Sequence, residues 1–254
     1  RLLADGVRLG MPDLLPLPTT LALAELDEHG AASYQFYFDH TSAPAVTDAD
    51  AHGAVDAGTR VLHVGTLGLL LEPMATSLEG LVADVGDQVL VFVDPNCRPR
   101  VVQDRAAYVA RLHRVLARAD VVKVSGDDLD YLAPGQDLVE AARALLGLGP
   151  RVVLFTDGGK AVHVITAAGS FVVDVPRVEV VDTVGAGDSF GGGFLATWIA
   201  EGHGRGELGD LEAHLEVVVG HAAHREAASH VGSQLELENL VERLSILKGL
   251  EVWI

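Results

Sequence analysis

The segment Asp182–Asp188 has the residue types of an anion-binding loop. It reads Asp-Thr-Val-Gly-Ala-Gly-Asp, and the apolar stretch Phe190–Ile199 that follows it can form a buried helix. Gly185 and Gly187 leave room for a bulky anion to approach the backbone. The N–H groups of the loop and of the first helical turn would face that anion, aided by the helix dipole.

Asp188 ends this loop, where an acidic side chain would repel phosphate if binding were its only task. Its position suits a base that accepts a proton from an attacking hydroxyl, as in phosphoryl transfer. The alternative is that Asp188 only caps the following helix. The complete string of loop and helix favours the catalytic interpretation over the capping one.

Three further polar segments follow apolar runs, namely Val93–Pro99, Lys123–Leu129 and Phe155–Ala161. In open parallel sheets, ligands collect at the carboxyl ends of the strands, so these segments are candidates for the same site. Each has a structural alternative: turn chemistry for Asp94 and Asn96, helix capping for Asp127 or Asp128, and a type I′ hairpin turn at Gly158-Gly159.

Short apolar runs alternate with amphipathic stretches between residues 61 and 155. The runs are Val61–Val64, Val89–Val93, Val121–Val124 and Val152–Phe155, and the stretches are Pro73–Val85, Arg105–Ala117 and Leu138–Leu146. Continuous β-branched runs between helices are typical of parallel strands that are buried on both faces. The pattern predicts an α/β fold with a doubly wound, mostly parallel sheet flanked by helices, in a single domain over residues 1–254.

Three regions depart from this alternation. Residues 17–47 predict a β-hairpin outside the repeat, and residues 162–181 predict an antiparallel edge added to the sheet. Residues 235–254 have the spacing of a C-terminal helix whose end is unclear.

Composition excludes several classes of protein. The chain has 254 residues, 49% of them hydrophobic, and 36 Asp and Glu against 18 Lys and Arg give a net charge of −18. Such a charge repels nucleic acid and anionic membranes. No apolar run reaches the roughly 18 residues of a membrane span, and no signal peptide is evident, so we expect a cytoplasmic protein. Cys97 is the single cysteine and is interpreted as a partly buried thiol.

The string Asp182–Asp188 resembles the C-terminal signature of the ribokinase/PfkB carbohydrate kinase family, in particular its fructokinase-like members. The resemblance implies ATP-dependent phosphorylation of a sugar hydroxyl. It makes Gly185, Ala186 and Gly187 the anion hole and Asp188 the catalytic base. It also implies a monovalent cation, K+, with Asp182 and Thr183 among its ligands.

The three polar segments match the same family in the right order. Val93–Pro99 is similar to its Asp-Pro-Asn-x-Arg element, which implies that Asp94, Asn96 and Arg98 serve the substrate side. Lys123–Leu129 resembles the segment that supplies an acidic residue, here Asp128, near the water shell of Mg2+. The resemblance further assigns the ATP site to Lys123, Thr156, Gly158 and Gly159.

The hairpin at 17–47 resembles part of the family's lid, which covers the sugar and often pairs between subunits. This implies a homodimer formed through the lid, with Phe36 and Phe38 lining the sugar side; core packing is the alternative for both side chains.

The chain departs from the family pattern at both ends. It begins at Arg1 without the family's Asp and Gly-Gly-Asn sugar-binding elements, so we expect that N-terminal sequence is missing. Residues 225–254 lack the small-residue turn that follows the adenine-side helix.

Substrate and activity therefore leave alternatives. Fructose is the first choice of sugar, and 2-keto-3-deoxygluconate, ribose and nucleosides stay open. A catalytically silent nucleotide- or sugar-binding protein on the same fold is the second hypothesis. A dinucleotide-dependent oxidoreductase is disfavoured, because its glycine fingerprint should open an early strand–helix unit and not lie far downstream.

Overall fold

The computed structural model describes residues 2–4, 6–11, 15–26, 32–178, 185–209, 215, 218–220 and 222–223. Its strands are β1 (Leu21–Leu26), β2 (Ala32–Tyr37), β3 (Val61–Gly65), β4 (Leu90–Asp94), β5 (Val121–Ser125), β6 (Val152–Thr156), β7 (Val162–Thr166) and β8 (Ser170–Val173). Its α-helices are α1 (Asp48–Gly53), α2 (Met74–Asp84), α3 (Arg105–Leu116), α4 (Gly126–Leu132), α5 (Leu138–Ala144) and α6 (Ala186–Ala200). Short 3-10 helices cover Ala43–Ala45, Thr66–Leu69, Leu145–Leu148 and Gly206–Gly209.

Strands β3 to β8 form one sheet in chain order. β3, β4, β5 and β6 are parallel, and β7 and β8 are added antiparallel at the edge. The predicted α/β fold is confirmed, including the antiparallel strands at 162–166 and 170–173. The register pairs Gly65 with Asp94 and Ser125 with Thr156, so the carboxyl ends of neighbouring strands lie side by side.

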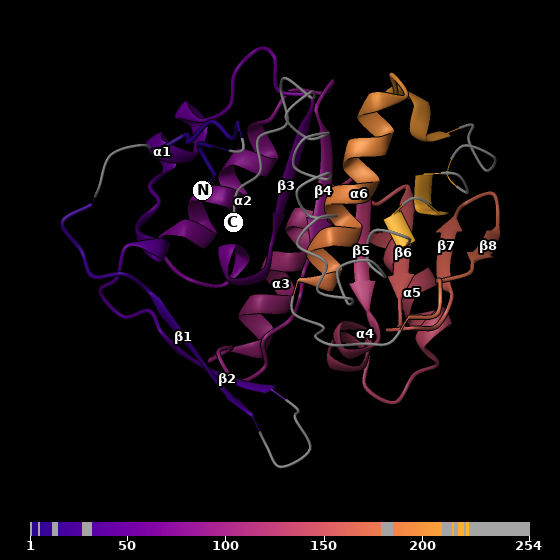
Figure 1. Cartoon of the computed structure of the whole chain (residues 1–254), viewed down its shortest axis with the longest axis horizontal. Coiled ribbons are helices and arrows are strands. Elements are labelled where there is room, and N and C mark those ends of the chain that lie inside the picture. The colour runs from indigo at the N-terminus through magenta and orange to yellow at the C-terminus, as the bar shows by residue number, and fades with distance from the viewer. Residues whose placement is uncertain are drawn as a thin grey trace.

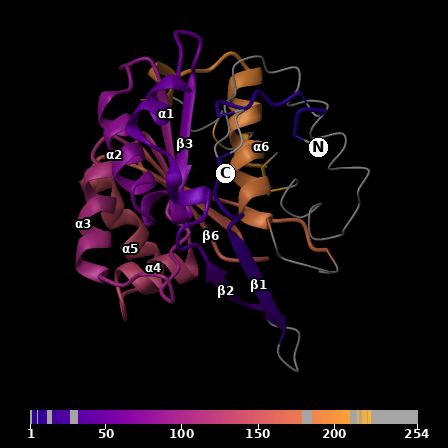
Figure 2. The same cartoon turned by 90° about the vertical axis from the view of Figure 1, so that its left-hand side faces the viewer.

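Alternate residues of the buried strands point to two separate cores. On β4, Val91 and Val93 join the core under α2, α3 and α5, whereas Leu90 and Phe92 join the core under α6. Figure 2 shows these layers, with α2, α3, α4 and α5 on one side of the sheet and α6 on the other. Both faces are therefore apolar, which explains the continuous β-branched runs in the sequence.

The predicted hairpin at 17–47 is the antiparallel pair β1–β2, which forms a separate two-stranded sheet. Figures 1 and 2 show that it projects from the main body on the side where α4 lies. The helix expected at 235–254 and the end of the third antiparallel segment, residues 179–181, lie outside the described residues.

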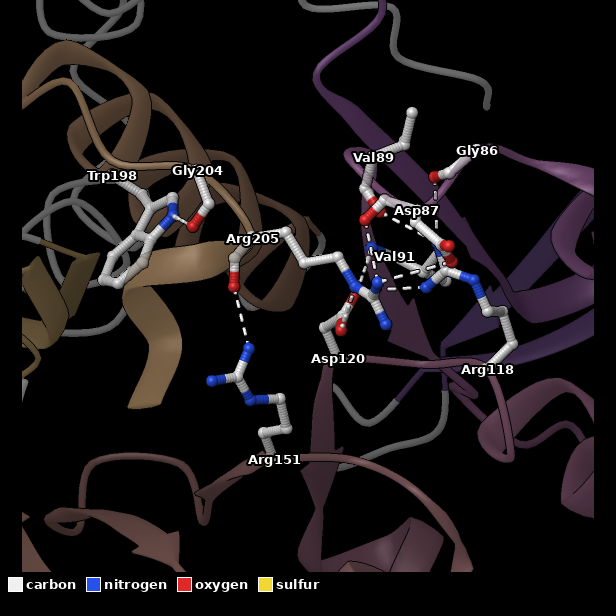
Figure 3. Close-up of polar contacts among 10 residues, drawn as sticks. All are labelled: Gly86, Asp87, Val89, Val91, Arg118, Asp120, Arg151, Trp198, Gly204 and Arg205. Carbon is white, nitrogen blue, oxygen red and sulfur yellow. Dashed lines mark hydrogen bonds and ion pairs between the residues drawn. The ribbon is translucent and has the colours of Figure 1, made fainter. Parts of the chain in front are cut away.

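The amino ends of the central strands are held together around Asp120, which directly precedes β5 (Figure 3). Its buried carboxylate accepts hydrogen bonds from the backbone N–H of Val91 at 2.9 Å and from Arg205 Nε at 2.7 Å, and it pairs with Arg118 at 3.2 Å. Arg205 lies after α6, and Arg151 Nη1 donates to its carbonyl oxygen. These bonds tie the chain that follows α6 to the start of the central strands.

Candidate active site

The amino end of α6 is the centre of the candidate site. Gly185 is its N-cap residue and has a φ of 78°, a left-handed conformation that favours glycine. The helix begins at Ala186, so its first N–H groups have no carbonyl partner within the helix and can bind an anion. Asp182 and Thr183, the predicted K+ ligands, lie outside the described residues.

Asp188 lies in the first turn of α6 and is exposed. The N-cap position is filled by Gly185, which carries no side chain for capping, so Asp188 is not the N-cap residue that the structural alternative required. An exposed carboxylate beside N–H groups that have no partner within the helix can accept a proton from a hydroxyl that approaches the same anion.

A buried ion pair lies beneath this helix. Lys123 Nζ is 3.0 Å from Asp94 Oδ2, and both side chains are only 6% exposed. Burial raises the pKa of Asp94, while the ammonium group of Lys123 opposes that rise. The other carboxylate oxygen, Asp94 Oδ1, is buried and has no hydrogen-bond partner among the described residues.

Two glycines let α6 approach the sheet. A Cβ atom on Gly187 would lie 2.7 Å from Lys123 Nζ, and one on Gly191 would lie 3.6 Å from the ring of Phe92. These glycines are four residues apart and so share one helix face. The ammonium group of Lys123 therefore lies directly beneath the predicted anion loop.

His63 was not singled out by sequence reasoning, yet it belongs to this cluster. Its ring packs edge-to-face on Phe92, with the ring centroids 5.0 Å apart. Burial lowers the pKa of His63 to about 4, and the Asp188 carboxylate partly offsets this effect. The imidazole is therefore neutral near pH 7. A polar residue between Leu62 and Val64 in an otherwise apolar strand is the signal that could have found it.

The loop after β4 carries Asn96 and Arg98, both half-buried. Asn96 has a φ of 39° and the facing Thr66, after β3, a φ of 49°; non-glycine residues with such values are uncommon and cluster at functional sites. The N–H of Thr66 donates to the carbonyl of Pro95 at 3.2 Å, which holds the two loops together. Arg98 Nη1 donates to the carbonyl oxygen of Cys97 at 3.3 Å.

Asp128 joins the loop after β4 to the start of α4. Its Oδ1 accepts the N–H of Cys97 at 2.6 Å, and its Oδ2 accepts from the N–H and hydroxyl of Ser125. This is a capping box, so the capping alternative describes the contacts that Asp128 makes. The sequence indicates a partly buried thiol at Cys97, but the side chain is buried, and this burial raises the pKa of the thiol to about 12.

The described residues contain no group of three or more His, Cys, Asp or Glu side chains that could hold a metal ion. Mg2+ usually keeps several waters and needs one or two carboxylates together with substrate phosphates. Asp128 is buried and both of its carboxylate oxygens accept hydrogen bonds from protein groups, so its predicted role near the water shell of Mg2+ stays a prediction.

The predicted ATP segment after β6 forms a hairpin turn into the antiparallel strand β7. Lys160 N–H donates to the carbonyl of Asp157, and Gly158 has a φ of 54°. A hairpin is thus the local structure, but its turn is not type I′, because that type needs a positive φ at both central residues and Gly159 does not have one. Thr156 is buried beside Ser125, whereas a Cβ atom added to Gly158 or Gly159 would meet no atom of the described residues within 4 Å. This leaves the turn open to a ligand.

Phe36 lies on β2 of the β1–β2 ribbon, and Phe38 follows that strand directly. Both side chains are half-buried. Phe36 is opposite Ala22 in the register of the ribbon. Their predicted place on the sugar side stays a prediction.

The comparisons with known proteins agree with this fold. The model of the pfkB family of carbohydrate kinases matches residues 16–238. A fructokinase from Rhizobium leguminosarum bv. trifolii is 34% identical over 184 residues, which are 72% of this chain and 56% of the relative. The chain thus spans little more than half the length of the curated relatives it matches.

Two solved fructokinase structures are similar over most of the chain. The one from Xylella fastidiosa with bound ATP has a TM-score of 0.73 and 26% identity, and covers 91% of this chain and 74% of its own. The one from Vibrio cholerae O395 in a fructose, ADP and calcium ion bound form has a TM-score of 0.66 and 26% identity. The match covers 85% of this chain and 66% of the Vibrio chain.

Within the described part of the chain, no helix is long and apolar enough to cross a membrane. The family model extends over the β1–β2 ribbon, the sheet and the loop at α6, and it includes every residue predicted for the site. The chain belongs to the pfkB family of carbohydrate kinases.

Proposed function

We propose that this protein phosphorylates a sugar hydroxyl with ATP, using Asp188 as the catalytic base. The observation that carries the proposal is the exposed Asp188 carboxylate in the first turn of α6, beside N–H groups that have no partner within the helix. Phosphoryl transfer needs few covalent steps from the protein; it needs positioning and stabilisation of charge. This end of α6 offers a proton acceptor and an anion site together.

In the proposed reaction, the sugar hydroxyl approaches Asp188 and gives up its proton as its oxygen attacks the γ-phosphorus of ATP. The bond from that phosphorus to the β-phosphate bridge oxygen breaks, and ADP leaves. The N–H groups of Gly185, Ala186 and Gly187 stabilise the negative oxygens of the transferred group. Mg2+, when bound through the waters near Asp128, would neutralise charge on the ATP phosphates.

The substrates are assigned to the two sides of α6. Lys123, Thr156, Gly158 and Gly159 serve the ATP side, and Asp182 and Thr183 contribute to a K+ site beside the loop. Asp94, Asn96 and Arg98 lie toward the sugar, with Phe36 and Phe38 of the lid above it. Fructose is the sugar that we propose, since the relative and the two solved structures described above are fructokinases.

The β1–β2 ribbon supports a homodimer as the functional form. Leu21, Leu23 and Tyr37 share one face of the ribbon and are 60%, 49% and 50% exposed. An exposed apolar face on a projecting two-stranded sheet is costly unless a partner covers it. A second copy of the same ribbon offers a matching surface by two-fold symmetry.

Substitution of the base tests the proposed activity. Asp188→Asn in the full chain should lower sugar-dependent ADP release by at least about 100-fold, because proton acceptance contributes 10²–10⁴-fold. ATP affinity by calorimetric titration should change little. The matched control is Glu140→Gln, an exposed acid in the first turn of α5 that lies outside the proposed site.

The wild-type chain would be assayed against a panel of sugars and nucleosides. Turnover by Asp188→Asn at the wild-type rate would refute the assignment of the base. Binding of ATP and sugar by the wild type without any turnover would instead support the second hypothesis, a catalytically silent binding protein on this fold.

A further inference from the structure

The Asp94–Lys123 pair lies among buried apolar residues, where a pair of apolar side chains would make the fold at least as stable. Its neighbours on β4 and β5 are Val93, Val122 and Val124, all fully buried. Removing two charges from water is expensive, and a well-packed apolar pair is often as stable as a buried ion pair. The pair is thus weak as a stability device, and its place beneath α6 needs another explanation.

The position of the ammonium group supplies that explanation. Lys123 Nζ lies 2.7 Å from the point where a Cβ atom of Gly187 would be, so any larger residue at this position would displace the ammonium group. Gly187 is also one of the residues whose N–H faces the predicted anion. The positive charge is therefore placed on the sheet side of the anion loop, in a site from which water is largely excluded.

The surrounding charges make a fixed cation useful here. The carboxylates of Asp94, Asp128 and Asp188 lie near one another, since Asp94 interacts electrostatically with both of the others. Three acidic groups would repel the phosphates of ATP, and the chain as a whole carries a net charge of −18. A buried cation acts strongly on such charges because the local dielectric is low.

We propose that Asp94 is a positioning residue that holds the ammonium group of Lys123 beneath Gly187, where its charge stabilises the phosphoryl group during transfer. This inference rests on the proposed kinase activity. It moves Asp94 from the substrate side of the site to a place under the anion loop. It also accounts for Gly187 by the space that the ammonium group needs.

A double-mutant cycle in the full chain separates this role from a structural one. Lys123→Met and Asp94→Asn each remove one charge, and the double variant leaves neither charge unpaired. Both single variants should unfold at lower urea concentration than the wild type. The double variant should regain much of that loss, since no uncompensated buried charge remains.

Catalysis should not recover with stability. In the double variant and in Lys123→Met, kcat should stay about 100- to 1,000-fold below the wild type, in the range found when one group that stabilises transition-state charge is removed. Affinity for ADP with aluminium fluoride, which mimics the group in transfer, should fall by a similar factor, while affinity for ADP alone should change less than threefold.

Arg118→Met is the matched control, because it breaks an ion pair with the buried Asp120 at the amino ends of the strands. It should lower the urea midpoint and leave kcat unchanged. A double variant with the wild-type kcat and wild-type affinity for ADP with aluminium fluoride would overturn the positioning role. Absence of sugar-dependent turnover in the wild type would overturn the proposed function itself, before any variant is compared.

Discussion

At the scale of single residues, glycines at this site serve three separate needs. Gly185 supplies a left-handed φ of 78°, and Gly187 leaves space for the Lys123 ammonium group. Gly65 ends β3 so close to β4 that a Cβ atom there would lie 1.9 Å from the carbonyl oxygen of Asp94. The sequence marks two of these positions by the glycine loop, but Gly65 gains its meaning only from the pairing of β3 with β4.

Sequence reasoning found the residues of the buried pair without finding the pair. The family resemblance assigns Asp94 to the sugar side and Lys123 to the ATP side, and each of them follows or interrupts an apolar run. Their contact depends on the register between β4 and β5, which pairs Phe92 with Val121 and Val93 with Val122. Neighbouring strands and their register are long-range properties, so the local pattern of either segment could not reveal the contact.

His63 gives a residue-scale prediction for the effect of pH on stability. Its pKa is about 4 in the folded protein, against an ordinary value of 6.5. The unfolded chain thus binds the proton more readily, and the free energy of unfolding must fall as the pH drops from 6.5 toward 4. Between pH 7 and pH 5 we expect this group to remove roughly 2 kcal/mol. Urea titrations at the two pH values measure the loss.

The variant His63→Phe keeps a ring against Phe92 and removes the titration. It should lose roughly 2 kcal/mol less than the wild type over the same interval. The exposed His113→Gln is the control and should follow the wild type. If His63→Phe shows the full wild-type dependence on pH, the pH dependence does not come from His63.

At the scale of elements, the sequence predicts helices and strands well where the apolar pattern is local. The central strands β3 to β6 and the helices α2, α3 and α5 lie within a few residues of their predicted ranges. Each strand is buried on both faces and each helix on one, so the pattern is strong. The turn at Gly158 is ambiguous by the same reasoning, since a hairpin and a ligand-binding turn use the same residue types.

The β1–β2 ribbon carries the element-scale prediction. If two copies pair through the exposed face, Leu21→Lys with Leu23→Lys should convert a dimer into a monomer, because like charges would meet across the symmetric interface. Light scattering coupled to size-exclusion chromatography measures the mass. Val172→Lys is the control, since Val172 is 55% exposed on β8 at the far edge of the main sheet and should leave the dimer intact.

A monomeric wild type at micromolar concentration would contradict the proposed dimer. A dimeric double-lysine variant would place the contact elsewhere on the molecule. The sequence predicts the ribbon itself, but its exposed face appears only when the strand register shows that Leu21 and Tyr37 are opposite each other.

At the scale of the whole molecule, the two ends of the parallel strands have different roles. The candidate site lies at the carboxyl ends of the strands, whereas the Asp120 cluster at their amino ends binds the chain that follows α6 (Figure 3). Arg205 and Asp120 are separated by 85 residues in sequence, and their bond joins the α6 layer to the central strands. The sequence offers no local sign of this link, because Arg205 lies in a polar, glycine-rich segment typical of any surface loop.

The Arg205 anchor yields the prediction at this scale. Arg205→Met removes the 2.7 Å bond from Nε to Asp120 and the 2.7 Å bond from Nη1 to the carbonyl of Asp87. Asp120 stays buried with Arg118 and the Val91 N–H as its other partners, so the loss should be partial, about 2 kcal/mol of unfolding free energy. Arg114→Met, which breaks an exposed pair with Glu79, should cost less than about 1 kcal/mol.

Urea titrations of both variants measure the difference, and kcat adds a second readout. Because Arg205 binds at the amino ends of the strands, opposite the candidate site, its loss should lower stability while turnover at saturating substrate stays within about twofold. If Arg205→Met and Arg114→Met had equal free energies of unfolding, the bond from Arg205 to the buried Asp120 would contribute no more to stability than an exposed ion pair. If Arg205→Met stayed fully folded but its kcat fell strongly, the bond between Arg205 and Asp120 would control the position of α6 and of the Asp188 carboxylate.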